Sequence, residues 1–211
     1  MPIAKHKSAS VLEGASVAIA EEISSDQRAM QTCRKIDSAL HELLRRRSYD
    51  NLRVSDITRK AAVGRSTFYA HYTSKDDLLK SQFFRNVAPM IVVTGKSESL
   101  LDCTLLFAHI KAVPRIFQAI MGSHPWSRGA GILRECVEKH VDRALLFGNQ
   151  TIPPAASSQV IPRPMIASFV SHGLIAVIEF SLRSGREQTP QQLQVILHKL
   201  VGTHLRELVD A

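Results

Sequence analysis

The chain has 211 residues, 45% of them hydrophobic and 22% charged, and its formal net charge is +8 at pH 7. This length and apolar content predict one or two compact domains with buried cores and exclude a disordered chain. Its three cysteines, Cys33, Cys103 and Cys136, form no CxxC pair, which argues against a disulfide framework or a structural zinc site. The histidines form no HExxH motif and no cluster with cysteine. We therefore expect a protein of the reducing cytoplasm with no metal and no cofactor.

Two segments resemble membrane-directed sequences only in part. Lys5 and Lys7 precede a weakly apolar stretch that loosely resembles a signal peptide, but Glu13 interrupts it. The apolar run over residues 166–180 contains Glu179 and is shorter than a bilayer span requires. The sequence therefore predicts a soluble, cytoplasmic protein with no membrane partner.

The positive charge is concentrated in one segment. Residues 28–90 carry 13 Lys and Arg against 6 Asp and Glu, a net charge of +7, whereas residues 1–27 carry −2 and residues 91–211 carry +3. A concentrated basic module indicates a polyanionic partner. Nucleic acid is the simplest interpretation, and an anionic membrane surface is the competing one.

The first predicted element is a helix that follows a patternless start. Residues 1–25 are small, polar and weakly patterned, and we interpret them as a flexible arm. From Gln27, apolar side chains recur at three- and four-residue steps, which predicts a helix that ends near residues 45–47. Its apolar stripe consists of Met30, Cys33, Ile36, Leu40, Leu43 and Leu44.

Two short helices are predicted next. The first should carry Val54, Ile57 and Ala61 inward, and the second should cover residues 65–71, after a break at residues 62–64. Two short helices joined by a three- or four-residue turn form a helix-turn-helix unit. The second helix of such a unit fits the major groove of DNA.

Longer helices are predicted for the rest of the chain. Thr73 and Ser74 can cap a helix that begins at Lys75. Further helices are expected over residues 100–112, 114–121, 132–147 and 163–184 and from residue 190 onward, with a loop over residues 148–162. No stretch alternates convincingly as a strand, so the expected fold class is all-α.

The stretch GRSTFYAHYTSK, residues 64–75, has the side chains that a phosphate backbone and base edges require. Arg65 and Ser66 open the short helix, where side chains can reach base edges, and arginine pairs well with guanine. Donors for phosphate oxygens are supplied by Thr67, Tyr69, His71 and, as a cation at the next helix start, Lys75.

Each of these residues also has a purely structural interpretation. Tyr69 or His71 taken alone is more often a packed amphipathic residue, and a lone Arg65 is usually a solvated surface charge. Phe68 and Tyr72 are better explained as wedges in a three-helix core. The combination of residue types, spacing and local charge favours DNA binding.

Residues 28–90 resemble the DNA-binding domain of the TetR family of bacterial transcriptional repressors. The family pattern runs Val-x-x-Ile-Ala-x-x-Ala-Gly-Val-Ser-x-x-Thr-Phe/Leu-Tyr-x-His-Phe-x-x-Lys-x-x-Leu. The matching residues are Val54, Ile57, Ala61, Val63, Thr67, Phe68, Tyr69, His71, Tyr72, Lys75 and Leu78. The motif covers about a third of the chain, and the remainder agrees only in length, helical content and order.

Four positions depart from this pattern. Thr58 stands where the family usually has Ala, and Arg53 stands where a Thr or Ser often caps the second helix and contacts phosphate. Arg53 could still meet phosphate as a cation, although its capping role would be lost. Ala62 replaces the turn glycine, which costs about 1 kcal/mol if the residue is left-handed. Gly64 replaces the serine that caps the recognition helix, at a cost of a few tenths of a kcal/mol.

The resemblance implies a helix-turn-helix DNA-binding domain over residues 26–73 and a helical effector-binding and dimerisation domain over residues 74–211. It implies a homodimer on a palindromic operator. Residues 163–184 carry an apolar stripe from Ile166 through Phe169 to Ile178 that can face the subunit's own core, and a second stripe that a partner could cover. The predicted interface residues are Ser168, His172, Ile175, Glu179, Leu193, Leu197 and Leu200; a solvated mixed face is the alternative.

The resemblance also implies a pocket for a small effector among the middle helices. The candidate lining residues are Phe84, Phe107, His109, Phe117, Trp126, His140 and Phe169, although an aromatic residue at helical spacing is more often part of the core. Their modest polar content suggests an apolar or amphipathic ligand.

Three functions therefore compete. The leading one is a ligand-responsive repressor, and the second is a DNA-organising protein without an effector. The third, a helical enzyme, finds no support in the motifs, because the sequence has no nucleophile elbow, phosphate loop or metal-ligand set. We expect a protein that is not an enzyme.

Overall fold

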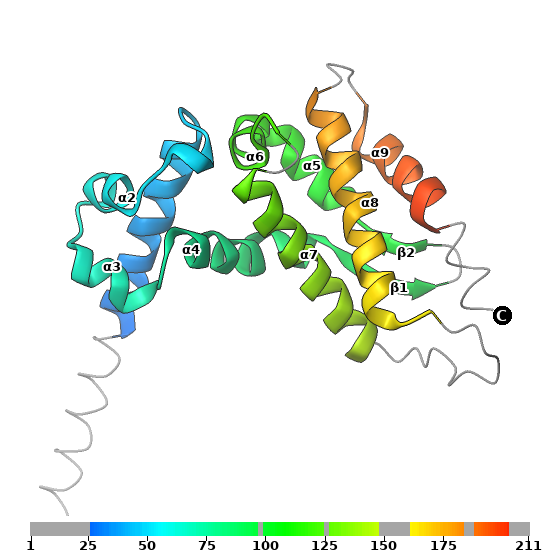
Figure 1. The fold of residues 1–211 in the computed structure, drawn as a ribbon, viewed down its shortest axis with the longest axis horizontal. Helices are drawn as coiled ribbons and strands as arrows, with labels where there is room; N and C mark the ends of the chain where they lie inside the picture. Colours follow the sequence, from blue (N-terminus) through cyan, green and yellow to red (C-terminus); the bar gives the residue numbers. More distant parts are fainter. Residues whose placement is uncertain (1–25, 97–98, 125–126, 148–160, 184–187, 203–211) are drawn as a thin grey trace, which may run out of the picture.

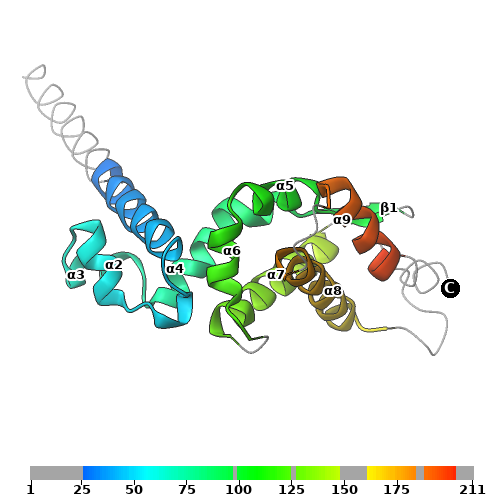
Figure 2. The ribbon, with the colours of Figure 1, turned by 90° about the horizontal axis from the view of Figure 1, so that it is seen from above.

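The computed structural model describes residues 26–96, 99–124, 127–147, 161–183 and 188–202. They form an N-terminal and a C-terminal lobe joined by the helix α4 (Lys75–Gln82) (Figures 1 and 2). The domain boundary predicted at residues 73 and 74 lies at the start of α4. The predicted arm over residues 1–25, residues 148–160 of the predicted loop, and Trp126 lie outside the described residues.

The N-terminal lobe is built from three helices. They are a helix over residues 26–44, α2 (Val54–Ala61) and α3 (Arg65–His71), with a 3-10 turn, η1 (Tyr49–Asn51), between the first two. These bounds agree with the predicted ones. The core of the lobe contains the fully buried side chains of Ile36, Leu40, Leu44, Tyr49, Ile57 and Phe68. Met30, a member of the predicted apolar stripe, is 54% exposed, although it lies about one turn before Cys33, which contacts α3.

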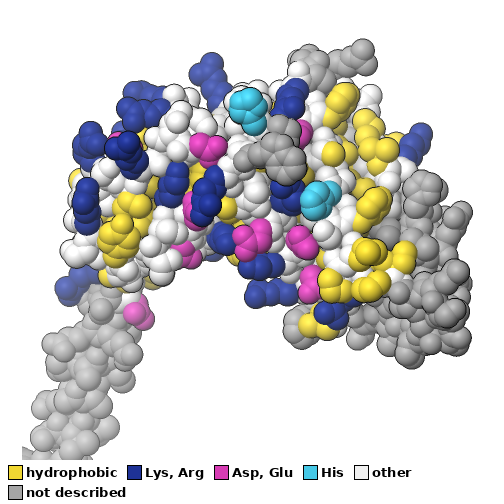
Figure 3. Space-filling view, viewed as in Figure 1, with side chains coloured by type: hydrophobic (Ala, Val, Ile, Leu, Met, Phe, Trp, Pro, Cys, Tyr) yellow, Lys and Arg dark blue, Asp and Glu magenta, His cyan; other side chains and the backbone are white. Residues whose placement is uncertain are grey.

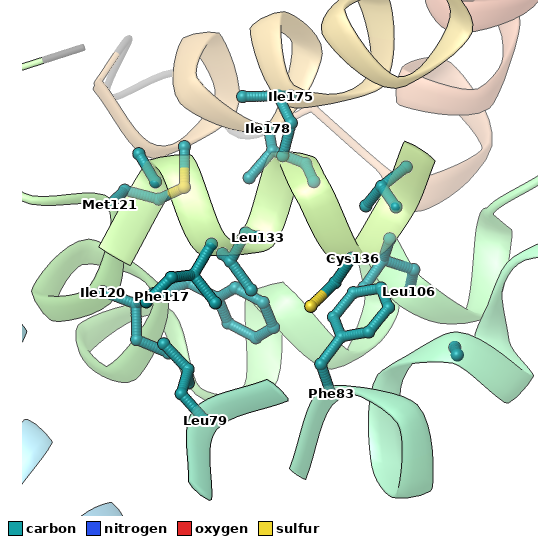
Figure 4. Close-up of a cluster of buried hydrophobic side chains, with 14 of the residues drawn as sticks. Leu79, Phe83, Leu106, Phe117, Ile120, Met121, Leu133, Cys136, Ile175 and Ile178 are labelled. Carbon is teal, nitrogen blue, oxygen red and sulfur yellow. The ribbon is translucent and has the colours of Figure 1, made fainter. Parts of the chain in front are cut away.

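The helix α4 takes part in both lobes. Gln82 Nε2 donates to the backbone carbonyl of Asp37 at 3.3 Å, and Arg85, just beyond the helix, pairs with the Asp37 carboxylate at 2.8 Å. Leu79 and Phe83 point the other way, into the C-terminal core beside α6 and α7 (Figure 4). The same helix is therefore packed against the first helix and against the C-terminal core.

The chain leaves α4 through a π-helical turn, η2 (Phe83–Val87), and a 3-10 turn, η3 (Ala88–Met90), and then forms a hairpin. Strands β1 (Val92–Lys96) and β2 (Ser99–Asp102) are antiparallel, with Val93 opposite Leu101. The hairpin corrects the expectation that no stretch is extended and that a helix begins at residue 100. Its cause is the run Val92-Val93-Thr94, because β-branched side chains fit a pleated surface. The fold class is all-α, and this hairpin is the only sheet in the described part of the chain.

Five helices complete the C-terminal lobe. They are α5 (Thr104–Ala112), α6 (Pro114–Met121), α7 (Arg128–Phe147), α8 (Arg163–Arg183) and α9 (Pro190–Leu197), followed by a π-helical turn, η4 (His198–Gly202). The long helices α7 and α8 run antiparallel and pack along each other (Figure 1). As predicted, α9 begins at a Thr189 cap, whose Oγ1 accepts from the Gln192 N–H at 3.1 Å. Figure 4 shows how side chains from α4 to α8 meet in one apolar core.

The helix α8 has nearly the extent that the sequence predicted, but it is longer than the apolar run over residues 166–180. At 21 residues, it is long and apolar enough to cross a membrane by length and composition alone, so the expectation that this run is too short is wrong. Eight of its residues are buried, among them Ala167, Val170 and Leu174. Such burial is typical of the core helix of a globular protein, and this is how α8 is used in the fold.

The corner between α6 and α7 is closely packed. Gly122 ends α6 with a positive φ of 67°, which a residue with a side chain rarely adopts. Ser127 Oγ accepts from the Ala130 N–H at 3.2 Å and caps α7, and it also donates to the Met121 carbonyl. This cap explains why α7 begins four residues before its predicted start. At Gly129 a Cβ atom would lie 2.1 Å from the carbonyl oxygen of Ile120.

We predict that Gly129→Ala lowers the free energy of unfolding by about 2 kcal/mol or more, because the added methyl group collides with backbone that cannot swing away. Gly131→Ala is the matched control in the same helix, since a Cβ atom there meets nothing within 4 Å. The control should be neutral or stabilising by about 0.5–1 kcal/mol. Urea unfolding of both variants checks this, and equal stabilities would contradict the close contact.

Candidate nucleic-acid interface

The start of α2 is capped by an acidic side chain instead of a hydroxyl. The Asp56 carboxylate accepts a hydrogen bond from the backbone N–H of Arg53 at 3.0 Å and pairs with Arg59 at 3.1 Å. Arg53 has no side-chain acceptor, so it cannot supply the reciprocal bond of a capping box. The sequence correctly predicted that Arg53 loses a capping role, but it missed that Asp56 takes over part of it. The guanidinium of Arg53 is left exposed.

The turn between α2 and α3 requires a left-handed residue. Ala62 adopts φ 54° and ψ 44°, so the condition under which its replacement of glycine costs free energy is met. The Val63 N–H donates to the Thr58 carbonyl at 3.1 Å, and the Ala62 N–H donates to the Arg59 carbonyl at 3.3 Å. These bonds satisfy two free carbonyls at the end of α2, in the pattern of a Schellman motif. The turn is therefore well formed although it lacks glycine.

The recognition helix α3 has one buried and one exposed face. Phe68 is fully buried, and Tyr72, just after the helix, is 4% exposed, which confirms their prediction as core wedges. Burial raises the pKa of Tyr72 to about 12, and its hydroxyl donates to Asp37 at 3.2 Å. These anchors fix the rotation of α3, so that its exposed side chains are Arg65, Ser66, Thr67, Tyr69 and Ala70.

The exposed face of α3 carries one cation and one large aromatic side chain. Arg65 has no ion-pair partner among the residues that the structure describes. Tyr69 is 55% exposed, and its ring meets the ring of Phe68 edge to face, with centroids 5.5 Å apart. The core therefore braces Tyr69 while most of its ring remains accessible. A guanidinium and two small hydroxyls lie at the start of the same helix.

Two predicted DNA contacts lie differently from the rest. His71 is half-buried, and its Nδ1 is 3.5 Å from Cys33 Sγ of the first helix. Lys75 Nζ donates to the carbonyls of Tyr49 at 2.9 Å and Leu52 at 2.8 Å, and it lies 4.4 Å from the centroid of the Tyr49 ring. Burial lowers the pKa of Lys75, against the opposing effect of nearby carboxylates. Lys75 thus binds η1 to α4 within the lobe, which corrects its prediction as a phosphate contact.

The predicted pocket residues do not all lie together. Phe107 and Phe117 are buried, and the half-buried His109 ring meets Phe117 edge to face at 5.7 Å. The half-buried His140 has its Nε2 2.9 Å from the carbonyl oxygen of Ile91. Phe84 is half-buried and lies under the guanidinium of Arg143. Phe169 is 51% exposed on α8, which corrects its prediction both as an inward-facing and as a pocket-lining residue.

The predicted dimer stripe is also partly wrong. Ile175, Leu193 and Leu197 are at most 3% exposed and belong to the core of their own subunit. Ser168 and Glu179 are half-buried, while His172 and Leu200 are exposed. The large exposed apolar residues of α8 are instead Met165, Phe169 and Phe180; periodicity placed Phe169 on the inward face and did not single out the other two. Figure 3 shows hydrophobic side chains gathered over α8 and α9, whereas Lys and Arg gather over the N-terminal lobe.

The fold and this exposed helix define a helix-turn-helix protein with a helical C-terminal domain. The model of the tetR family of bacterial regulatory proteins matches residues 36–81. YxbF, an HTH-type transcriptional regulator of Bacillus subtilis (strain 168), is 36% identical over 67 residues, which are 31% of this chain and 18% of YxbF. The chain thus spans less than a fifth of that relative.

One solved structure extends the likeness of the fold to the C-terminal lobe. A TetR transcriptional regulator from Streptococcus agalactiae 2603V superposes with a TM-score of 0.57 and 23% identity, over 85% of this chain and 98% of its own. At 23% identity this likeness shows a similar fold and nothing more. The dihydroxyacetone kinase operon activator DhaS aligns with a TM-score of 0.49 and 17% identity, over 84% of this chain and 96% of its own. The match to the TetR family lies in residues 36–81, where the helix-turn-helix motif predicted it.

The left-handed alanine in the turn gives a stability prediction. Ala62→Gly should raise the free energy of unfolding by about 1 kcal/mol, because glycine adopts φ 54° without the clash of a Cβ atom. Thermal unfolding measures the change. Ala70→Gly, at an exposed position within α3, is the control and should lower stability by about 1 kcal/mol. A destabilised Ala62→Gly protein would contradict the strain assigned to the turn.

Proposed function

We propose that the protein is a sequence-specific DNA-binding transcriptional regulator of the bacterial cytoplasm, which binds a palindromic operator as a homodimer. The observation that carries the proposal is the exposed face of α3. Phe68 and Tyr72 hold one side of the helix in the core, and Arg65, Ser66, Thr67 and Tyr69 lie on the other. A short, rigid helix with these groups at its N-terminal end has the form that reads bases in the major groove.

The use of the acidic residues in the N-terminal lobe supports a polyanionic partner. Asp37, Glu42, Asp56 and Asp76 are each engaged by an arginine or lysine of the same chain. Their negative charge is thereby neutralised locally. The exposed arginines without an ion-pair partner in the described residues include Arg45, Arg46, Arg53 and Arg65. A surface with such an excess of cations should bind DNA with a steep dependence on salt concentration.

The exposed residues of α3 suggest a division of roles. Arg65 occupies the first position of the helix, from which a guanidinium can reach guanine O6 and N7. The hydroxyls of Ser66, Thr67 and Tyr69 suit phosphate oxygens, which fix the register of the protein on the duplex. Arg53, at the start of α2, can meet the flanking phosphate as a cation. We do not assign DNA contacts to Lys75, because its ammonium group is bonded to backbone carbonyls.

The outer face of α8 supports homodimerisation. Met165, Phe169 and Phe180 are 61%, 51% and 48% exposed and recur at helical spacing on the side opposite the buried stripe. With the exposed Val195 and Leu200 of α9 and η4, they make an apolar surface that a second copy can cover (Figure 3). Two recognition helices must then meet successive major grooves about 34–36 Å apart, which requires a palindromic operator.

A small apolar or amphipathic effector would act by changing the conformation of this dimer. The apolar core among α5, α6 and α7 contains Phe107 and Phe117 and one half-buried polar ring, His109. A ligand that binds better to subunits with the wrong spacing of the recognition helices weakens operator binding by linkage. Effector and operator would then compete through conformation, and the regulator would act as a repressor that the effector releases.

Selection of binding sequences from random DNA duplexes tests the proposal directly. The purified protein should enrich a palindromic sequence, and the enriched duplex should bind far more tightly than unrelated DNA. Repeating the selection with an extract of bacterial metabolites tests the effector. A protein that retains no duplex at low ionic strength would contradict DNA binding, and an asymmetric enriched sequence would contradict the homodimer.

The role of Arg65 gives a prediction for the selected duplex. Arg65→Ala should weaken binding to that duplex by about 1–3 kcal/mol and relax the preference at one base pair of each half-site. Arg115→Ala, which removes an exposed arginine from α6 in the other lobe, is the control and should change neither. Fluorescence anisotropy on the duplex and its single-base variants measures both. An equal loss on all sequences would make Arg65 a phosphate contact.

The apolar face of α8 gives a prediction for assembly. Phe169→Glu should raise the dissociation constant of the dimer on the order of a hundredfold, because a carboxylate is costly to bury at an apolar interface. Leu105→Glu is the control, since Leu105 is 66% exposed on α5, a helix that contributes no residue to the proposed interface. Sedimentation velocity over a range of concentrations gives the masses. The proposed interface is wrong if both variants stay dimeric or if both dissociate.

A further inference from the structure

One carboxylate joins the two lobes. Asp76 is the second residue of α4, and its side chain is 15% exposed. One of its oxygens accepts a hydrogen bond from the hydroxyl of Tyr49, in η1 of the N-terminal lobe. The other accepts from Arg128 Nε, at the start of α7, at 2.6 Å. Asp76 therefore connects three elements, and one of them belongs to the C-terminal lobe.

The N-terminal partner of Asp76 is held firmly. Tyr49 is fully buried, and its backbone carbonyl accepts from Lys75 Nζ at 2.9 Å. The same ammonium group donates to the carbonyl of Leu52 and lies over the Tyr49 ring. Burial and the bond to Asp76 raise the pKa of Tyr49, so its hydroxyl stays protonated as a donor. The start of α4 and the loop before α2 thus move as one unit.

The backbone that carries the C-terminal partner is also fixed, although the side chain of Arg128 is 70% exposed. Arg128 lies between Ser127, whose buried hydroxyl caps α7, and Gly129, which touches the end of α6. Its backbone therefore cannot shift without disturbing the α6–α7 corner. Figure 1 shows this end of α7 beside the N-terminal lobe. The guanidinium reaches from a fixed corner of one lobe to the fixed carboxylate of the other.

A second ion pair links the same helices, and its carboxylate is more exposed than that of Asp76. Lys80 of α4 pairs with Glu135 of α7 at 2.8 Å, and Glu135 also pairs with Lys139 of its own helix. Glu135 is 43% exposed and Lys80 is 34% exposed, and an ion pair with so exposed a carboxylate contributes little. The attraction between Arg128 and Asp76 is weakened by solvent too, and what distinguishes Asp76 is its enclosure and its second bond, to Tyr49. Asp76 is the more enclosed carboxylate. Burial raises its pKa, but the bonds from Arg128 and Tyr49 outweigh that effect, so the pKa lies below its usual range.

We infer that Asp76, held between Tyr49 and Arg128, is a positioning residue that sets the angle between the DNA-binding lobe and the C-terminal lobe. The inference rests on the proposed function as a dimeric DNA-binding regulator. α3 ends only four residues before α4 begins, so a rotation of the start of α4 carries the recognition helix with it. In a dimer joined through α8, that angle sets the distance between the two recognition helices. Arg128 therefore restricts which spacing of half-sites the dimer accepts.

Arg128→Gln removes the charge that reaches Asp76, and Lys139→Gln is the matched control. Both variants take one positive charge from α7, but Lys139 pairs only within its own helix among the described residues. Binding is measured on the selected palindrome, on palindromes with the half-sites moved one base pair closer or further apart, and on a duplex with one half-site. Arg128→Lys, which keeps the charge, is the conservative variant.

Wild type and Lys139→Gln should prefer one spacing. In Arg128→Gln the preference for that spacing over its neighbours should fall about tenfold, within the usual range of coupling between sites. Its affinity for the single half-site should stay within about twofold of wild type, and Arg128→Lys should recover part of the preference. An unchanged spacing preference in Arg128→Gln would overturn the inference. A parallel loss on the single half-site would overturn it too, because that result indicates damage to the DNA-binding lobe.

A measurement without DNA separates this inference from the proposed function. Spin labels at Ala70 of α3 and Ala112 of α5, both exposed, report the distance between the lobes within one subunit. The label pair is diluted with unlabelled subunits so that distances across the dimer do not contribute. Arg128→Gln should broaden the distance distribution, and Lys139→Gln should not. A wild-type protein that ignores DNA would refute the proposed function, whereas an unbroadened distribution in Arg128→Gln would refute the positioning role alone.

Discussion

The sharing of α4 between two lobes is the constraint on which the rest of the structure depends. Leu79 and Phe83 are buried with α6 and α7, while Gln82 and Arg85 bond to the first helix through Asp37. A helix with partners on both sides cannot turn freely relative to either. The recognition helix precedes it by a short connection, so its orientation is tied to the C-terminal core. The ligand regulation that we propose for that core then requires no further linker.

Local signals predicted the helix-turn-helix unit well. The bounds of α3 follow from a break at residues 62–64 and from the cap at Ser74, and each of these depends on neighbours along the chain. Ala62 is left-handed because the turn requires that conformation whatever residue occupies it. The rotation of α3 was predicted for the same reason, since aromatic residues at positions 68 and 72 identify the buried side. Side-chain spacing is enough to predict the buried side of an element when that element has a single apolar face.

The errors occurred where tertiary contacts decide the outcome. α8 is apolar on more than one side, so periodicity could not tell which stripe faces its own subunit, and Phe169 and Ile175 were assigned to the wrong faces. Lys75 has the same sequence context whether its ammonium group meets a phosphate or a backbone carbonyl. The three-residue run at 92–94 was too short to outweigh the helical pattern that follows it. The bond between Arg128 and Asp76 joins residues 52 positions apart, which no local pattern can reveal.

The exposed side chains of α8 have a consequence for the life of the protein in a cell. In the proposed homodimer a partner covers Met165, Phe169 and Phe180, so a newly made subunit would present them to water until it bound a second copy. Exposed apolar surfaces of this kind are bound by chaperones and proteases. Unpaired subunits would therefore be short-lived, and the amount of active regulator would rise more steeply than the rate of its synthesis. A cell that synthesises the regulator slowly would therefore contain almost no active dimer.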